Sequence, residues 1–321
     1  MRILVTGATG FIGSFLVDRL AKENLAVVAA VRNSFGLKLD SSINLIDIGN
    51  LTSSLDWGDA LRGVDVVVHL AARAHILRDP VSDPLAHYRY INVDCSLNLA
   101  HQAVRAGVKR FIYMSSIKVN GESTVSGKPF SSNDNPMPED FYGISKYEAE
   151  IGLQGIAKDQ SMELVIIRPP LVYGPGVKGN FLNLMKWMMR PLPLPFSLIN
   201  SLRSYVSLEN LVDFIITCIY HPRAANQVFL VSDDKDLSIV DLCYLIGRAL
   251  ARPAMLFSIP VSWIYFFANL MNRQAVADRL CLSLQVDITD SKRLLGWAPK
   301  ITPEEAINET ARYFLSKNNK P

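Results

Sequence analysis

The 321-residue chain lacks a hydrophobic run long enough to cross a membrane, and it lacks any block of like charge. A spanning helix needs roughly 20 consecutive apolar residues. The most apolar segments, 181–199 and 259–271, are too short or are broken by proline or charge. The 33 basic and 30 acidic side chains are mixed along the chain, so no nucleic-acid surface is indicated. The N-terminal apolar run is too short for a signal peptide, and we expect a cytoplasmic protein.

Cysteine is also sparse, and its spacing argues against two kinds of cross-link. The four cysteines stand at positions 95, 218, 243 and 281, far from the paired spacing of a zinc site. Scattered cysteines in a chain without a signal peptide indicate free, mostly buried thiols in a reducing compartment. The five histidines show no metal-ligand spacing either, and we predict no metal site.

What the sequence does contain is a regular alternation of strand-like and helical segments. The strand-like segments are 3–6, 27–31, 43–48, 64–70, 111–115 and 164–168. This alternation predicts an α/β fold, a doubly wound parallel sheet of the Rossmann type with both faces covered. After residue 170 prolines, glycines and aromatic helices take over, with one more strand at 227–231. We therefore predict a main domain over 1–170. A smaller, mostly helical part over 171–321 would bind substrate and return some strand to the main sheet.

A glycine-rich turn follows the first strand and opens the next helix. Its glycines, Gly7, Gly10 and Gly13, are spaced by three. In a dinucleotide-binding turn the first glycine permits the tight turn and the second lets backbone approach the pyrophosphate, while the third lets the helix pack on the strand. We therefore expect the 1–170 domain to bind NAD or NADP. The candidate cofactor contacts are Gly7, Thr9, Gly10, Phe11, Ile12, Gly13, Asp47, Ile48, Leu70, Ala71, Ala72, Asn92, Tyr142, Lys146 and Pro169.

The residues after the second strand bear on the choice between these two cofactors. An acidic side chain there binds the ribose 2′-hydroxyl of NAD, whereas an arginine tolerates the 2′-phosphate of NADP. Here the strand 27–31 is followed by Arg32, Asn33 and Ser34, without a carboxylate. The sequence therefore favours NADP over NAD, with Arg32 as the contact.

A serine, a tyrosine and a lysine follow in an order that suits hydride chemistry at a carbinol or carbonyl carbon. Ser116 closes the fifth strand, and Tyr142 and Lys146 stand at the head of a helix. Residues four apart share a helix face, so the Lys146 ammonium can lower the pKa of the Tyr142 phenol. Tyr142 would then act as general acid and base, while Ser116 hydrogen-bonds the same substrate oxygen. The pair is common by chance, and its weight comes from the glycine turn in the same chain.

With these motifs the chain resembles the extended short-chain dehydrogenase/reductase superfamily, in particular its sugar-nucleotide epimerase, dehydratase and reductase group, over essentially its whole length. Three later segments carry the resemblance further: 168–175 reads Arg-Pro-Pro-Leu-Val-Tyr-Gly-Pro, 203–211 reads Arg-Ser-Tyr-Val-Ser-Leu-Glu-Asn-Leu, and 290–297 reads Asp-Ser-Lys-Arg-Leu-Leu-Gly-Trp. The resemblance implies a nucleotide-sugar substrate. Asn180 and Arg203 would hold its diphosphate, and Ser116 and Lys118 would also contact it. By the same analogy a homodimer is expected.

Departures from the group's pattern narrow the expected reaction. Dehydratases of the group carry an Asp-Glu pair directly after the catalytic serine or threonine, where this chain has Ile117 and Lys118. Dehydration is therefore disfavoured, as is the decarboxylation that uses the second position, and chemistry at C4 of the sugar remains. Segments 115–121 and 169–181 are most similar to a bacterial branch that makes surface polysaccharides such as the O-antigen of lipopolysaccharide. That branch includes 4-reductases of UDP-4-keto-6-deoxy-N-acetylhexosamines.

Four functions stay open at this point. The missing acid after the second strand favours the 4-reductase, which takes hydride from NADPH. The first alternative is a 4-epimerase of a UDP-hexose or UDP-N-acetylhexosamine with tightly bound NAD. The second is a 4-epimerase of a lipid-diphosphate-linked hexosamine, with segment 261–270 in the membrane interface, although burial of that segment in the core is favoured. A catalytically silent cofactor-binding protein is disfavoured, because Ser116, Tyr142 and Lys146 are all present.

Overall fold

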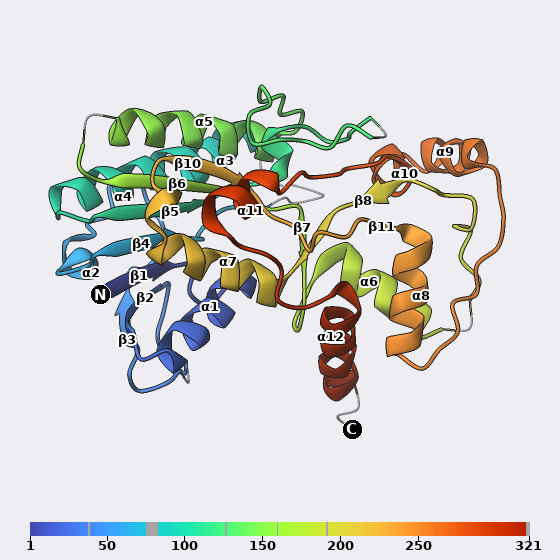
Figure 1. Ribbon diagram of the computed structural model, residues 1–321, viewed down its shortest axis with the longest axis horizontal. Coiled ribbons are helices and arrows are strands. Elements are labelled where there is room, and N and C mark those ends of the chain that lie inside the picture. The colour runs from blue at the N-terminus through green and yellow to red at the C-terminus, as the bar shows by residue number, and fades with distance from the viewer. Residues whose placement is uncertain (38, 75–82, 126, 159, 191, 319–321) are drawn as a thin grey trace.

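The computed structural model describes residues 1–37, 39–74, 83–125, 127–158, 160–190 and 192–318 (Figure 1). Its centre is a seven-stranded parallel sheet in the order β10-β6-β5-β4-β1-β2-β3. The strands are β1 (Arg2–Thr6), β2 (Ala26–Val31), β3 (Asn44–Asp47), β4 (Val66–His69), β5 (Arg110–Met114), β6 (Glu163–Arg168) and β10 (Gln227–Leu230). All seven predicted strands are confirmed to within two residues. The inner strands are apolar runs buried on both faces, whereas the edge strands β3 and β10 are more exposed.

Helices cover both faces of this sheet. On one face lie α1 (Phe11–Lys22), α7 (Leu208–Tyr220) and α11 (Thr289–Leu295), which share a core with the strands. On the other face α2 (Gly58–Leu61), α4 (Cys95–Arg105) and α5 (Phe141–Ala157) form a second apolar layer. The predicted doubly wound sheet is therefore confirmed, and its carboxyl edge is where ligands bind in such folds.

The chain after residue 170 builds a mostly helical part beside that edge (Figure 1). Its core joins α6 (Gly179–Met188), α8 (Ile239–Ala249) and α12 (Pro303–Asn318). Two small sheets accompany these helices, pairing β7 (Leu171–Tyr173) with β9 (Tyr205–Ser207) and β8 (Leu202–Arg203) with β11 (Leu237–Ser238). As predicted, this half of the chain contributes a strand, β10, to the main sheet. It also contributes two helices, α7 and α11, that pack on that sheet.

Helix α9 (Val261–Leu270) is where the fold differs most from expectation. We predicted that this apolar segment packs in the core, but none of its residues is buried. It packs on α10 (Gln274–Cys281) at the outer end of the C-terminal part, away from the main sheet (Figure 1). Apolar residues fill all sides of the segment, so hydrophobicity alone does not predict which side is covered. Within the described ranges, no helix is long and apolar enough to cross a bilayer.

Candidate active site

The glycine turn between β1 and α1 has the geometry that a bound dinucleotide requires. Gly7 has a φ of +66°, and a Cβ on it would stand 2.8 Å from the backbone nitrogen of Ala71, beyond β4. A Cβ on Gly13 would stand 2.1 Å from the carbonyl oxygen of Gly7, so only glycine lets α1 pack this closely. No described side chain caps the first amides of α1, which leaves the positive end of the helix for an anion. These residues fit a pyrophosphate.

Two predicted cofactor contacts follow neighbouring strands. Val31, the last residue of β2, pairs in register with Asp47, the last residue of β3. The Asp47 carboxylate accepts a hydrogen bond of 2.9 Å from the hydroxyl of Ser34, three residues beyond β2. Arg32 directly follows β2 and is exposed. The region after β2 therefore contains a carboxylate from β3 as well as the predicted arginine.

The other predicted cofactor contacts lie at the carboxyl edge of the sheet or in the first turn of α1. Thr9 and Gly10 are exposed; Phe11, Ile12, Ile48, Leu70, Ala71 and Ala72 are half-buried; Pro169 is buried. Carboxyl ends of parallel strands share one edge, so the structure brings these positions to the same side of the sheet.

Asn92 differs from its predicted role as a cofactor contact. It is fully buried in a single π-helical turn, η1 (Tyr90–Asp94), directly after α3 (Pro84–Arg89). Its side-chain oxygen accepts from the Arg73 amide at 2.8 Å, and its nitrogen donates to the Ser145 hydroxyl at 3.0 Å. Ser145 in turn donates to the carbonyl of Tyr142 at 2.8 Å. We therefore interpret Asn92 as a residue that positions α5, since its amide is already bonded to the protein.

A buried histidine extends this network to the first strand. His69 Nδ1 lies 2.7 Å from the Thr6 hydroxyl, and Nε2 lies 2.9 Å from the Ser96 hydroxyl. Ser96 donates to the carbonyl of Asn92 at 2.8 Å. Burial lowers the pKa of His69 to about 3, so the ring is neutral and bridges two hydroxyl groups. His69 therefore joins β1 to α4, the helix that carries Ser96.

Ser116, Tyr142 and Lys146 come together beyond the carboxyl end of β5. The Ser116 hydroxyl lies near the Tyr142 phenol, near enough for a hydrogen-bonding effect that lowers the pKa of the phenol. On α5, the ammonium of Lys146 lies 5.9 Å from the centroid of the Tyr142 ring. Asp140 caps this helix, accepting a bond of 2.7 Å from the amide of Gly143, and so fixes where α5 begins. The predicted arrangement of these three side chains is present.

Their electrostatics differ from the expectation. Burial raises the pKa of Tyr142, and the charge of Asp140 raises it further, while the Ser116 hydrogen bond lowers it. Burial also lowers the pKa of Lys146 to about 7, although the Glu150 carboxylate opposes this shift. A lysine with that pKa is roughly half protonated at neutral pH. Lys146 is therefore only partly charged in the protein alone, and its Nζ donates to the Met114 carbonyl at 2.7 Å. That its ammonium lowers the pKa of Tyr142 stays a prediction.

An ion pair that the motifs did not predict lies next to these residues. Glu150 follows Lys146 by one helical turn and is 1% exposed. Its carboxylate accepts from Arg168 Nε at 3.0 Å and Nη2 at 2.5 Å, and also from the Ser115 hydroxyl. Arg168 donates a third bond, of 3.0 Å, to Asn120. The available signal was the spacing, since Glu150 shares a face of α5 with Lys146.

Lys118, predicted to contact substrate, is held by protein carboxylates. Its Nζ lies 2.6 Å from Glu122 and 2.5 Å from Asp140. Asp140 caps α5, so this ion pair joins the segment after Ser116 to the start of the helix that carries Tyr142. We therefore interpret Lys118 as a positioning residue, and its contact with substrate stays a prediction.

The two residues predicted to hold the substrate diphosphate lie in the C-terminal part. Asn180 is exposed in the first turn of α6, and Arg203 is half-buried in β8. Arg203 Nη1 donates to the carbonyl of Leu282 at 2.8 Å. Burial lowers the pKa of Arg203, and the nearby charge of Arg279 on α10 also lowers it. The charge of Glu122 acts in the opposite direction and raises this pKa. Sequence reasoning did not predict a second arginine in this region.

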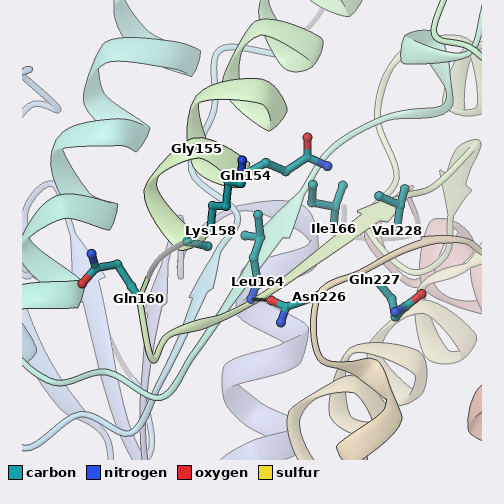
Figure 2. A pocket seen from close by; sticks show the side chains of 10 residues that line it. Gln154, Gly155, Lys158, Gln160, Leu164, Ile166, Asn226, Gln227 and Val228 are labelled. Carbon is teal, nitrogen blue, oxygen red and sulfur yellow. Dashed lines mark hydrogen bonds between the residues drawn. The ribbon is translucent and has the colours of Figure 1, made fainter.

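The clearest cavities in the described structure lie elsewhere. One of about 460 Å³ is bounded by the end of α5 and by β6 and β10 (Figure 2). Its labelled side chains include Gln154, Lys158, Leu164, Asn226 and Val228. A second, of about 580 Å³, is lined by residues at the amino ends of β4, β5 and β6, including Asp65, Lys109 and Glu163. Since the glycine turn and Tyr142 line neither cavity, we do not assign either to the active site.

A doubly wound sheet with this glycine turn and these serine, tyrosine and lysine side chains defines the extended short-chain dehydrogenase/reductase class. More specifically, the sequence pattern of the NAD dependent epimerase/dehydratase family matches residues 3–232. The chain belongs to this family, which confirms the predicted resemblance.

Individual relatives and structures agree with this assignment. A Vibrio cholerae protein named UDP-glucose 4-epimerase is 48% identical over 99% of this chain and 97% of its own length. An Escherichia coli O157:H7 protein named N-acetyl-alpha-D-glucosaminyl-diphospho-ditrans,octacis-undecaprenol 4-epimerase is 27% identical over 97% of this chain and 94% of its own length. The crystal structure of UDP-glucuronic acid 4-epimerase from Bacillus cereus in complex with NAD has the same fold, with a TM-score of 0.79, 21% identity and 99% coverage of both chains.

Proposed function

We propose that this protein is a 4-epimerase of a UDP-hexose or UDP-N-acetylhexosamine that keeps NAD bound through turnover. The observation that carries the proposal is that Ser116, Tyr142 and Lys146 come together at the same edge of the sheet as the glycine turn. The 48% identity to the Vibrio cholerae protein, over nearly the whole chain, supports an epimerase over the 4-reductase that the sequence motifs favoured.

The proposed reaction needs only one acid/base group from the protein. The Tyr142 oxygen takes the proton of the C4 hydroxyl as the C4–H bond breaks, and it returns a proton to the same oxygen after the 4-keto sugar has presented its other face. Ser116 hydrogen-bonds that oxygen and orients it. Bound NAD would supply the hydride acceptor in the first half and the donor in the second, held by the glycine turn. Oxidation and reduction cancel, so one acid/base group suffices.

The position of Lys146 suits this role for Tyr142. Burial raises the pKa of Tyr142, so forming its phenolate requires positive charge nearby. Lys146 lies one turn along the same helix, and the buried carboxylate of Glu150 raises its pKa against the effect of burial. We infer that Glu150 keeps part of the Lys146 population protonated at neutral pH, and that this ammonium favours the phenolate.

The residues after Ser116 support epimerisation over dehydration. Ile117 is 4% exposed, and Lys118 is held by Glu122 and Asp140. Neither side chain supplies the second acid and base that removal of water would need.

We propose NAD as the cofactor in place of the NADP that the sequence favoured. The family description and the NAD in the Bacillus cereus structure support NAD. So does Asp47, because its carboxylate, bonded to Ser34 just after β2, would disfavour a further negative charge such as the 2′-phosphate of NADP nearby. The effect of Arg32 stays a prediction: if it selects NADP, Arg32→Ala should weaken NADPH binding far more than NADH binding.

One observation favours a second candidate, the 4-epimerase of a lipid-diphosphate-linked hexosamine. Helix α10 carries Arg279 beside Arg203, and the exposed apolar helix α9 packs on α10. A lipid-linked diphosphate between these arginines would have an apolar surface close by. The name of the Escherichia coli relative supports testing this substrate.

The test is turnover by the purified protein. UDP-glucose, UDP-N-acetylglucosamine and undecaprenyl-diphospho-N-acetylglucosamine are each incubated without added cofactor. A UDP-4-keto-6-deoxy-N-acetylhexosamine is incubated with NADPH or NADH. We expect interconversion of the C4 epimers of a UDP-sugar. Reduction of the keto sugar without any epimerisation would support the reductase and overturn the proposal. Turnover of the lipid-linked sugar alone would favour the second candidate.

A further inference from the structure

Helix α9 presents its largest apolar side chains to solvent. Trp263, Phe266, Phe267 and Leu270 are 57%, 66%, 48% and 75% exposed. Their spacing of i, i+3, i+4 and i+7 places them on one face of the helix, here called the α9 face. The rings are clustered, with centroids 6.2 Å apart for Trp263 and Phe267 and 5.5 Å apart for Phe266 and Phe267. Contiguous exposed apolar surface of this kind marks an interaction site.

The opposite side of α9 attaches the helix to the protein and so fixes which face points outward. Val261, Ile264, Tyr265 and Ala268 are half-buried there, and Ile264 packs against the C-terminal core. The Tyr265 hydroxyl hydrogen-bonds Asp278 on α10. The α9 face is therefore held in place by packing and a polar contact behind it. Exposed apolar side chains continue just outside the helix with Phe257 at 43% and Met271 at 69%.

The charge around α9 suggests what covers it. Segment 253–272 contains no Asp, Glu, Lys or Arg, and exposed arginines, Arg252 and Arg273, flank it on both sides. The carboxylate nearest in sequence, Asp278, lies on α10 near Tyr265, whose side chain is on the half-buried side of α9. Tryptophan and phenylalanine favour the boundary between headgroups and acyl chains, and arginines favour the anionic headgroups. Aromatic residues between arginines therefore complement an anionic lipid surface.

We propose that α9 docks this protein on the surface of an anionic phospholipid bilayer. The α9 face enters the boundary between headgroups and acyl chains, and Arg252 and Arg273 contact lipid phosphates. Ten residues of helix extend about 15 Å, half the thickness of the hydrocarbon core, so α9 lies in the plane of the interface and does not span it. The docking is independent of the proposed reaction and would hold for an enzyme with either a soluble or a lipid-linked substrate.

A second copy of the chain fits this surface less well. A twofold contact places the same patch on both sides of the interface. With α9 against α9, the arginines that flank one helix would meet the same arginines of the other, with no acidic residue in 253–272 to compensate them. A lipid surface instead brings the opposite charge.

Sedimentation with vesicles of phosphatidylcholine containing about a third phosphatidylglycerol tests the proposal. Wild type should pellet with these vesicles. The triple variant Trp263→Gln, Phe266→Gln, Leu270→Gln should bind the vesicles at least about tenfold more weakly than wild type, because it removes most of the apolar contact. Tyr220→Gln is the matched control, because Tyr220 is 53% exposed but ends α7 on the main sheet. It should pellet like wild type. Arg252→Gln with Arg273→Gln should lose the preference for phosphatidylglycerol.

Two results would overturn the docking proposal. One is wild type that stays in the supernatant both with these vesicles and with vesicles of phosphatidylcholine alone, or a triple variant that pellets as well as wild type. The other is a dimeric wild type that does not bind vesicles, together with a triple variant that is monomeric in sedimentation velocity. That pair of results would assign the α9 face to a second copy. Turnover of UDP-sugars without vesicles is measured on the same samples. Vesicle binding without turnover would count against the proposed function and leave the docking intact.

Discussion

Removal of the charge on Glu150 is the perturbation that the structure specifies most fully. Glu150→Gln keeps the shape of the side chain, but it leaves the guanidinium of Arg168 buried without its counterion. The side chains of Arg168 and Glu150 are 5% and 2% exposed, and two hydrogen bonds of 2.5 and 3.0 Å join them. Little water can replace the lost carboxylate, so the variant should be destabilised strongly.

The expected size follows from this burial. Breaking one partner of a buried ion pair costs about 3–5 kcal/mol of unfolding free energy, which for a chain of 321 residues corresponds to a fall in Tm of about 4–7 °C. A second effect acts on the active site, because the Glu150 carboxylate raises the pKa of Lys146. Its loss should lower that pKa below about 7. If the ammonium favours the Tyr142 phenolate, the limb of the pH profile where activity falls with rising pH should move to lower pH.

The assays are thermal melting and the pH dependence of kcat, with Glu148→Gln as the control. Glu148 lies on the same helix and also pairs with an arginine, Arg89, at 2.6 Å, but their side chains are 32% and 48% exposed. Surface pairs contribute little, so this control should melt close to wild type. Replacing both buried partners, with Glu150→Leu and Arg168→Met, should cost less than Glu150→Gln alone. Equal melting temperatures for Glu150→Gln and Glu148→Gln would refute the reasoning.

Four further predictions concern two glycines and the acid/base residues. Tyr142→Phe should lower kcat by about a hundredfold or more with an unchanged melting curve, and retained turnover would remove Tyr142 from its role. Gly13→Ala should lose bound dinucleotide, because its Cβ would meet the Gly7 oxygen at 2.1 Å. Gly155→Ala on α5 should raise the free energy of unfolding by about 0.5–1 kcal/mol, because the added Cβ would meet no described atom within 4 Å. Burial lowers the Lys146 pKa from 10.5 to about 7, so this residue adds native stability as pH rises through that window. Tm measured at both ends of the window should therefore rise less with pH in Lys146→Met than in wild type.

The fold and the main site residues could be predicted because they depend on local sequence. Each strand of the main sheet is an apolar run, and the glycine turn needs Gly7 and Gly13 for steric reasons that hold wherever this turn occurs. Ser116, Tyr142 and Lys146 were recognisable because their order along the chain follows the order of the strands and helices that carry them.

The interactions that the sequence did not reveal depend on contacts between distant segments. Asn92 and Lys118 have side chains suited to ligand binding. In the structure, Asn92 hydrogen-bonds Ser145 and Lys118 pairs with Asp140, and both contacts position α5. The partner of Glu150 comes from β6, and nothing near Glu150 in the sequence indicates it. Helix α9 was predicted to be buried because hydrophobicity usually means burial, but an interaction surface has the same composition.

The central claim, epimerisation at C4 with retained NAD, is tested most directly with a UDP-sugar that carries deuterium at C4. The purified protein is incubated with this substrate and no added cofactor, and the product is examined by mass spectrometry and NMR. The account predicts the C4 epimer with deuterium still at C4, because the hydride removed from one face is returned to the other. Loss of the deuterium, or conversion only when NADPH and a 4-keto sugar are supplied, would contradict it.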